Sequence, residues 1–367
     1  MKTKCPERKQ MSGRTFFAVT IGLICALLVC ALVSCESQDS LYAAAQKLFK
    51  EGKFEEAITA FEKLEGFKDV AEQIDKCKNA ITEQKYGDAL KLLAEEKYEE
   101  AKTALEALGG FKDSAEKIAE AVKGIDYGKA VSKIAEGKIK EAYELLSGLE
   151  GFKDSVEKAK EIFGQYKEEL MKDPEVGGHI FLGKYEQDND PDNGAEDIEW
   201  LVLARDGNKA LVISLYALDT MPFDPSYEKV PWADSSIRDW LNGEFIEGTF
   251  TEDEQKKILD STLNDVRNPV YGTMPGKETE DKVFFLSESE VAEYFATDED
   301  RKCEGTAYCY AQGANMAKDG SCMWWTRSPG RDTKHASYVL YTGSVFHHGY
   351  MNYRTGCAVR PAMWIEI

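Results

Sequence analysis

The sequence predicts an α+β multidomain protein in which an all-α array of helical repeats is followed by an α+β domain. Three observations support this prediction. No proline occurs between Pro6 and Pro174, every tryptophan and histidine lies beyond residue 177, and one four-residue motif recurs three times within the proline-free stretch. A proline inside a helix costs about 3 kcal/mol. The first half can therefore form unbroken helices, and the second half holds the aromatic groups of a compact domain.

Residues 1–34 are expected to be a signal peptide, because a basic stretch precedes the apolar run from Phe16 to Val33. The run ends in Leu32-Val33-Ser34-Cys35, which resembles the lipobox of bacterial lipoproteins. That resemblance implies cleavage before Cys35, acyl chains such as palmitate on this cysteine, and a lipidated tether over residues 35–39. The protein would then be anchored to a membrane on the exported side of the bacterial cell envelope. An uncleaved membrane anchor is the alternative.

The net charge of −20 argues against nucleic acid as a partner, because binding to phosphates depends on Lys and Arg. The length of 367 residues is sufficient for two domains with their own cores.

Three repeats are expected over residues 40–172. Gly66-Phe67-Lys68-Asp69 returns at 110–113 and 151–154, and tyrosines 42, 86 and 127 keep the same spacings. Each glycine follows the last apolar residue of a helix, where a positive φ is needed, and the phenylalanine can fold back onto that helix. Asp69 with Glu72 has the spacing of a capping box at the start of the next helix.

Apolar residues within each repeat lie on one helix face, as Ala57, Phe61 and Leu64 do. Lys53-Phe54-Glu55-Glu56-Ala57, with Leu41, Ala45 and Leu48 upstream, resembles tetratricopeptide (TPR) repeats, although the period is longer than the ~34 residues of that family. The resemblance implies an array of helical hairpins. Such an array is either a spacer or a peptide-binding groove, and the lack of a basic or aromatic patch favours the spacer.

Residues 173–178, with Pro174 and two glycines, are expected to be a hinge, and residues 179–367 an α+β recognition domain. Alternating hydrophobicity predicts strands at both ends of this domain, and the signals between them predict helices. Ser235 or Ser236, Thr251, and Ser287 are expected to cap those helices. The predicted strands are residues 180–185, 198–203, 210–214, 283–286, 324–328, 338–341, 345–348 and 359–365.

Five motifs in this domain together resemble an uncharacterised bacterial domain family that often occurs on lipoproteins. More distantly, the tryptophan-rich strands and the closing Arg-Pro strand are similar to the C-type-lectin-like and formylglycine-generating-enzyme group. The resemblance implies either binding of a glycan or protein, or oxidase chemistry. The motifs begin at Ile198 (IEWLVL), Ile237 (IRDWLN), Lys282 (KVFFLS), Trp324 (WWTRSPG) and Val359 (VRPA).

Five residues of these motifs are candidates for ligand binding, as guanidinium and indole groups are frequent in binding sites. The alternative is that the arginines form buried ion pairs and the tryptophans belong to the core, with one indole left as a stacking platform. The five are Arg238, Trp324, Trp325, Arg327 and Arg360.

An acidic segment after the first predicted strand offers oxygen ligands at the alternate spacing that Ca²⁺ prefers. Pro191 lies inside it, and a solvated loop is the alternative. No cofactor other than calcium is expected. The candidate ligands are Asp188, Asp190, Asp192, Glu196 and Glu199.

Four cysteines of the C-terminal domain are candidates for one or two disulfides, with three pairings open. No two of them have the CxxC spacing of a zinc site. They are Cys303, Cys309, Cys322 and Cys357.

No set of catalytic residues is recognisable in the sequence. The expected function is therefore non-enzymatic: an envelope-anchored lipoprotein whose helical spacer displays a lectin-like domain that binds a glycan or protein. The alternative is an enzyme of the formylglycine-generating type or an unknown hydrolase on the same domain.

Overall fold

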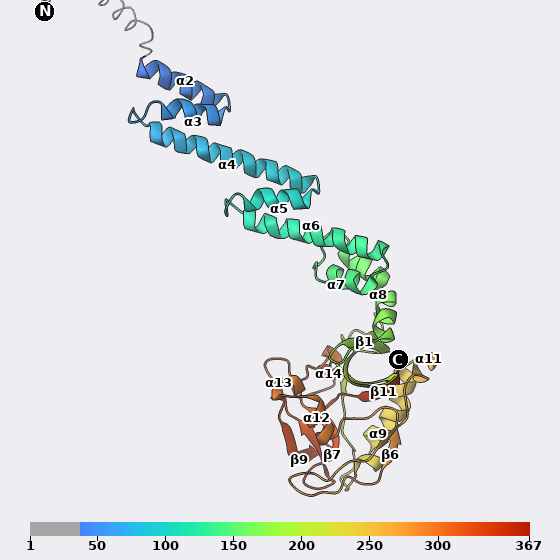
Figure 1. The fold of residues 1–367 in the computed structure, drawn as a ribbon. Helices are drawn as coiled ribbons and strands as arrows, with labels where there is room; N and C mark the ends of the chain where they lie inside the picture. Colours follow the sequence, from blue (N-terminus) through green and yellow to red (C-terminus); the bar gives the residue numbers. More distant parts are fainter. Residues whose placement is uncertain (1–36) are drawn as a thin grey trace, which may run out of the picture. The chain divides into compact units, whose positions relative to one another are not determined.

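The structure, a computed structural model, describes residues 37–367. The expected signal peptide and Cys35 lie outside the described residues. The chain divides into two compact units, residues 1–129 and 130–367. Helices form the N-terminal part and the C-terminal part is rich in sheet, so the fold combines helix and sheet as expected (Figure 1). Among residues 37–367, no helix has both the length and the apolar composition that crossing a membrane requires.

Helices of unequal length follow one another in the first unit. The first half of α4 packs in one apolar cluster through Cys77, and its second half packs in the next cluster through Tyr86. One helix thus ends one repeat and begins the next, which explains the long period. The elements are α2 (Gln38–Lys50), α3 (Phe54–Glu62), α4 (Val70–Ala94), α5 (Tyr98–Glu106) and α6 (Ser114–Ala135), whose last residues belong to the second unit.

The recurring Gly-Phe-Lys-Asp motif forms the turns that precede the long helices. Gly66, Gly110 and Gly151 have φ values of 79°, 84° and 82°, which confirms the predicted positive φ. Phe67 packs its ring edge-on against Tyr42, with 6.0 Å between ring centroids. This contact joins Phe67 to α2, whereas the phenylalanine was expected to fold back onto the helix that ends just before the motif.

The predicted capping role of the motif aspartate is wrong. At neither Asp69 nor Asp154 does the side chain accept a capping hydrogen bond from a backbone N–H of the helix that follows. Instead, the Tyr42 hydroxyl donates to Asp69, and the Tyr86 hydroxyl donates to Asp113. This hydrogen bond from Tyr42 lowers the pKa of Asp69. The contact also explains why tyrosine and motif recur with the same spacings.

The second unit opens with α7 (Ile139–Ser147) and α8 (Ser155–Lys172). Helix α8 packs on strand β1 (His179–Tyr185), where the ring centroids of Phe163 and Phe181 are 5.2 Å apart. The segment expected to be a hinge is hydrogen-bonded to the sheet: Gly177 N–H donates to the Val202 carbonyl (2.8 Å), and Val202 N–H to that of Gly178 (2.9 Å).

Two main sheets form the C-terminal domain. The first is antiparallel, in the order β1, β2 (Glu196–Asp206), β3 (Lys209–Ser214) and β11 (Ala362–Glu366). The second has the order β4 (Asp219–Thr220), β10 (Ala358–Val359), β7 (Trp324–Pro329), β8 (His335–Val339) and β9 (Val345–Met351). A small sheet pairs β5 (Ser261–Leu263) with β6 (Thr279–Asp281).

The strand expected over residues 359–365 is two strands in two different sheets. Pro361 has no N–H to donate to a ladder, and the chain leaves β10 at Arg360 and enters β11 at Ala362. Residues 283–286, expected to be a strand, are buried but form only the isolated bridge between Phe284 and Ala362.

Short helices connect the sheets, and the predicted caps are confirmed. Ser235 accepts a hydrogen bond from Arg238 N–H, and Thr251 and Ser287 form complete capping boxes with Glu254 and Glu290. The helices are η1 (Trp232–Asp234), α9 (Ser236–Trp240), η2 (Leu241–Phe245), α10 (Ile246–Thr249), α11 (Glu252–Gln255), α12 (Glu288–Tyr294), α13 (Asp298–Arg301) and α14 (Ala307–Ala311).

Candidate functional site

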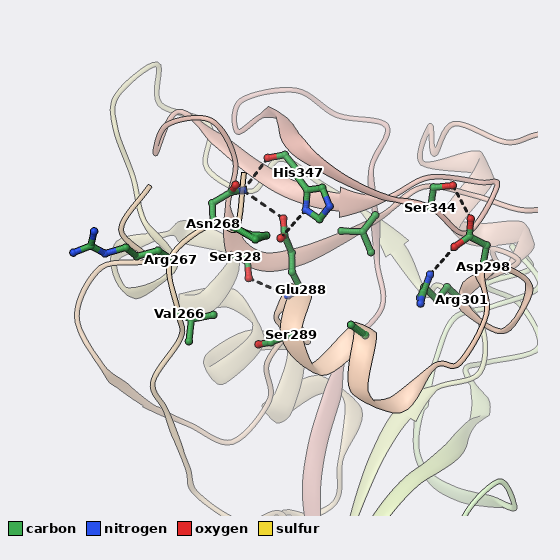
Figure 2. A pocket seen from close by; sticks show the side chains of 13 residues that line it. Val266, Arg267, Asn268, Glu288, Ser289, Asp298, Arg301, Ser328, Ser344 and His347 are labelled. Carbon is green, nitrogen blue, oxygen red and sulfur yellow. Dashed lines mark hydrogen bonds and ion pairs between the residues drawn. The ribbon is translucent and has the colours of Figure 1, made fainter. Parts of the chain in front are cut away.

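A pocket of about 440 Å³ lies beside α12 in the C-terminal domain (Figure 2). Its walls come from residues 266–269, α12, α13 and β9. Val266, Pro269, Ala292 and Val345 supply apolar surface, and charged or polar side chains lie between them. A concave site with apolar walls and a few polar groups is the usual form of a ligand pocket.

Glu288 and His347 form a hydrogen-bonded pair in this pocket, as Figure 2 shows. The Glu288 side chain is 7% exposed, that of His347 is 40% exposed, and 2.8 Å separates the carboxylate from Nδ1 of the ring. Glu288 follows the capping residue Ser287, and its own N–H donates to Ser328 Oγ (3.0 Å). The start of α12 therefore fixes the carboxylate, and the carboxylate orients the imidazole.

Asn268 holds the loop that forms one wall. Its buried amide donates to the carbonyls of Pro329 (2.8 Å) and His347 (2.9 Å). Its Oδ1 accepts from the N–H groups of Val270 and Tyr271, at 3.0 and 2.9 Å. Two of these bonds join the loop to the end of β7 and to β9, and the other two hold the loop itself.

Two arginines line the pocket, and only one of them is in an ion pair with a described residue. Arg301 is paired with Asp298 (2.6 Å), which also accepts from Ser344 Oγ (2.9 Å). Arg267 is exposed and makes no ion pair with any residue between 37 and 367. Glu288 is bonded to His347 and Asp298 to Arg301. The charge that is left free for a ligand is therefore the guanidinium of Arg267.

Four of the five residues predicted to bind a ligand are buried, Arg238 is half-buried, and the five do not converge on this pocket. Trp324 and Trp325 are both 0% exposed, and their indole N–H groups donate to the carbonyls of Arg301 and Met221. This corrects the expectation of a stacking platform, because neither ring has a free face. Both indoles contribute to the domain core.

The three arginines of that prediction have structural partners. Arg238 binds the fully buried carboxylate of Asp281 at 2.6 Å. Arg360 donates from Nε to the Ser214 carbonyl and stacks over Trp324, with 5.0 Å from the guanidinium carbon to the ring centroid. The expected alternative, buried arginines held by acids and carbonyls, describes them better than a ligand site does.

Arg327 supports the pocket from behind. Its side chain is 4% exposed and binds Asp265 (2.6 Å) and Glu290 (2.5 Å). Asp265 precedes the loop of the pocket, and Glu290 lies on α12, so one guanidinium joins two of the walls. Burial raises the pKa of Asp265, although Arg327 acts in the opposite direction.

The predicted calcium ligands come together only in part. Asp188 and Glu196 gather with Glu186, and their ligand oxygens lie within 4.8 Å of one another. Backbone N–H groups already donate to these carboxylates, including Gln187 to Glu196 at 2.7 Å. Glu199 is bonded to His179 instead, at 2.5 Å. The carboxylates of Asp190 and Asp192 do not belong to this group, and Asp190 accepts from Asp192 N–H (3.2 Å).

All four candidate disulfide cysteines are buried free thiols in the structure and belong to the core of the domain. Burial raises the pKa of both Cys309 and Cys357.

The sequence prediction missed the residues that build the pocket. Glu288 directly follows a recognised capping residue, and His347 lies on a predicted strand, so each element was expected. Position 268 carries no motif, and nothing in the sequence places residues 268, 288 and 347 together. Their convergence depends on the pairing of strands and loops far apart in the chain.

Comparison with known families assigns the C-terminal part of the chain. Residues 207–367 match a family described as "Domain of unknown function (DUF6273)". Comparison with curated proteins and with solved structures gave no match. The match covers the pocket but begins after β2, so β1 and β2, which complete the first sheet, precede it. Residues 207–367 thus carry an uncharacterised domain, as the sequence motifs indicated.

Proposed function

We propose that the protein is a lipoprotein of the bacterial cell envelope whose C-terminal domain binds a glycan or protein ligand in the pocket beside α12. A lipid on Cys35 anchors it on the exported side, the TPR-like repeats act as a spacer, and the C-terminal domain has a C-type-lectin-like fold. The observation that carries the binding function is a wall held by Asn268 next to the unpaired Arg267.

The shape of the site favours binding because little has to be ordered when a ligand arrives. Four hydrogen bonds of Asn268 hold the loop, and a preorganised loop lowers the entropic cost of association. The loop also exposes apolar side chains: Val266 is 65%, Val270 59% and Tyr271 47% exposed. Such groups cover the apolar face of a sugar ring or of a peptide side chain.

The free guanidinium indicates the polar part of the ligand. Arg binds carboxylates through two parallel hydrogen bonds. A ligand with an acidic group beside an apolar surface, such as an acidic sugar or an acidic peptide, therefore matches Arg267 and the apolar wall. Spacer and anchor hold this pocket away from the membrane.

Binding is tested with the full chain on an array of acidic and neutral glycans and by capture of envelope proteins. Arg267→Ala should weaken the binding of a captured ligand about tenfold or more, which corresponds to about 1.4 kcal/mol. Arg354→Ala is the matched control, since Arg354 is also exposed but does not line the pocket. Equal affinity of Arg267→Ala and wild type, or no acidic ligand on either platform, contradicts the proposal.

The second candidate function is an enzyme, either an unknown hydrolase or one of the formylglycine-generating type. It is favoured by the Glu288–His347 pair, since a carboxylate that orients an imidazole is part of many general-base sites. Turnover of ester, amide or glycoside substrates that disappears in His347→Gln, with binding retained, would establish it over the binding function.

The anchor is tested separately. Cys35→Ala should abolish incorporation of labelled palmitate and leave a longer, unprocessed chain. Acylation that persists in this variant contradicts the lipid site and leaves the pocket proposal unaffected.

A further inference from the structure

Two of the four buried cysteines of the C-terminal domain lie opposite each other on neighbouring segments. Glu304 and Ser321 form an antiparallel bridge, and Cys322 N–H donates to the Cys303 carbonyl at 2.8 Å. The same register places Cys303 across from Cys322. Opposed residues of an antiparallel pair have Cα atoms about 4.5–5.5 Å apart, which lies within the range of about 4.4–6.8 Å found between the Cα atoms of disulfide-bonded residues. No large backbone movement is therefore needed to join the two.

Both side chains are buried: Cys322 is 0% and Cys303 3% exposed. The Cys303 thiol donates only to nearby backbone carbonyls, those of Glu304 (3.3 Å) and Leu215 (3.6 Å). Cys309 is engaged elsewhere, because its thiol donates to the Asp219 carbonyl at 3.1 Å. Of the three pairings open from the sequence, the geometry therefore favours the one that joins Cys303 to Cys322.

A buried cation lies beside this pair. Arg360 is 2% exposed, and its Nη1 has no hydrogen-bond partner within the described part of the chain. Burial opposes ionisation of Cys303, but the hydrogen bond from Cys322 and the charge of Arg360 outweigh it and lower the pKa of Cys303. Cys303 is thus the member of the pair that is suited to attack, because the thiolate is the nucleophile in disulfide exchange.

We propose that Cys303 and Cys322 form a disulfide by exchange with a disulfide-bonded oxidant. The Cys303 thiolate attacks one sulfur of the oxidant, which forms a mixed disulfide and releases the other half as a thiol. Cys322 then loses its proton and attacks the Cys303 sulfur, which releases the second half. Two protein thiols are oxidised to one disulfide, and one oxidant disulfide is reduced to two thiols.

The disulfide closes the segment that contains α14 and joins it to the start of β7. Cys303 follows α13, and Cys322 immediately precedes Met323 and the strand. Arg360, which lies nearby, keeps its contacts with the Ser214 carbonyl and with the rings of Trp324 and Phe295.

The test maps the disulfide in the full chain after refolding with oxidised glutathione. Remaining thiols are alkylated in denaturant without reductant, and the chain is digested with trypsin. Cys303 and Cys309 share one tryptic peptide, so a second cleavage after Glu304 is needed to separate them. Mass spectrometry should then find one cross-linked peptide pair that joins Cys303 to Cys322, with Cys309 and Cys357 alkylated.

Two variants sharpen the result. Cys309→Ser should keep the cross-link, whereas Cys303→Ser should leave Cys322 alkylated. A cross-link between any other pair, or alkylation of all four cysteines in refolded wild type, overturns the proposal. The disulfide map of wild type shows by itself whether Cys303 and Cys322 are joined, even if a variant does not fold.

Discussion

The helical repeats and the C-terminal domain differ in how far along the chain their polar contacts reach. Tyr42 and Asp69 are 27 residues apart, and so are Tyr86 and Asp113. In the C-terminal domain, Arg327 reaches back 62 residues to Asp265, and Arg360 reaches back 146 to Ser214. A repeat thus depends on its neighbours alone. In the C-terminal domain, a single buried side chain instead joins segments that are far apart in the sequence. Its removal should therefore destabilise more of the domain than the removal of a side chain destabilises in the repeats.

The largest effect is expected for Arg327→Met. Asp265 and Glu290 would lose their cation inside the protein, and removal of one partner of a buried pair costs about 3–5 kcal/mol. All six tryptophans lie in the C-terminal domain, so urea unfolding followed by tryptophan emission reports on it directly. Arg354→Met at the exposed Arg354 is the control and should change little. A loss below about 1 kcal/mol would mean that the pair behaves as a surface ion pair.

Leu105→Ala should have a comparable or slightly smaller effect that stays within the repeats. Leu105 is 0% exposed in the cluster around α5, and such a truncation costs about 2–5 kcal/mol. Backbone hydrogen exchange of α4 to α6 should accelerate, while the unfolding midpoint from tryptophan emission stays unchanged. A shift of that midpoint would show that the two regions unfold together and would remove the contrast.

Two glycine substitutions in the repeats should act in opposite directions. Gly110 has φ of 84° and no atom within 4 Å of an added Cβ, so Gly110→Ala costs only the left-handed backbone conformation, about 1–2 kcal/mol. Gly87 lies inside α4, also with free space around it, and Gly87→Ala should stabilise by about 0.5–1 kcal/mol. Thermal unfolding followed by circular dichroism separates the two. If Gly110→Ala also raised the unfolding temperature, the left-handed backbone conformation at Gly110 would be wrong.

The smallest effect is expected from His179 on β1, whose ring is hydrogen-bonded to Glu199 on the neighbouring strand β2. The hydrogen bond to Glu199 raises the pKa of His179 above its usual 6.5. Since the folded pKa is raised, the stabilisation is fully present below the unfolded pKa and is lost as pH rises through the folded pKa. Proton NMR of the histidine ring should show the raised value. His179→Gln should abolish the pH dependence, and an unshifted His179 would refute it.

Most of the repeat region could be predicted because its determinants are local. Gly66, Phe67 and the apolar spacing of Ala57, Phe61 and Leu64 act within a few turns of chain. The exception is Asp69, which has the spacing of a cap but bonds to Tyr42. Its partner lies on an earlier helix, and local capping rules do not include such competition.

In the C-terminal domain, caps such as Ser287 could be predicted, but the pocket could not. Asn268, Glu288 and His347 meet only because β8 pairs with both β7 and β9 and because the loop at 268 bonds to the end of β7 and to β9. The paired motif tryptophans were expected to alternate between faces of a strand with one face open. Strand β7 is instead covered on both sides and buried along its whole length.

The passage of the chain between sheets at Arg360 and Pro361 has a consequence for biosynthesis. Strand β10 completes the second sheet and β11 completes the first, so the second sheet cannot close before residue 359 has left the ribosome, nor the first before residue 366. The helical repeats need no such delay, because each one contacts only sequence already made. We therefore expect the nascent chain to carry folded or folding repeats together with an unstructured C-terminal domain, which is the state that chaperones would encounter.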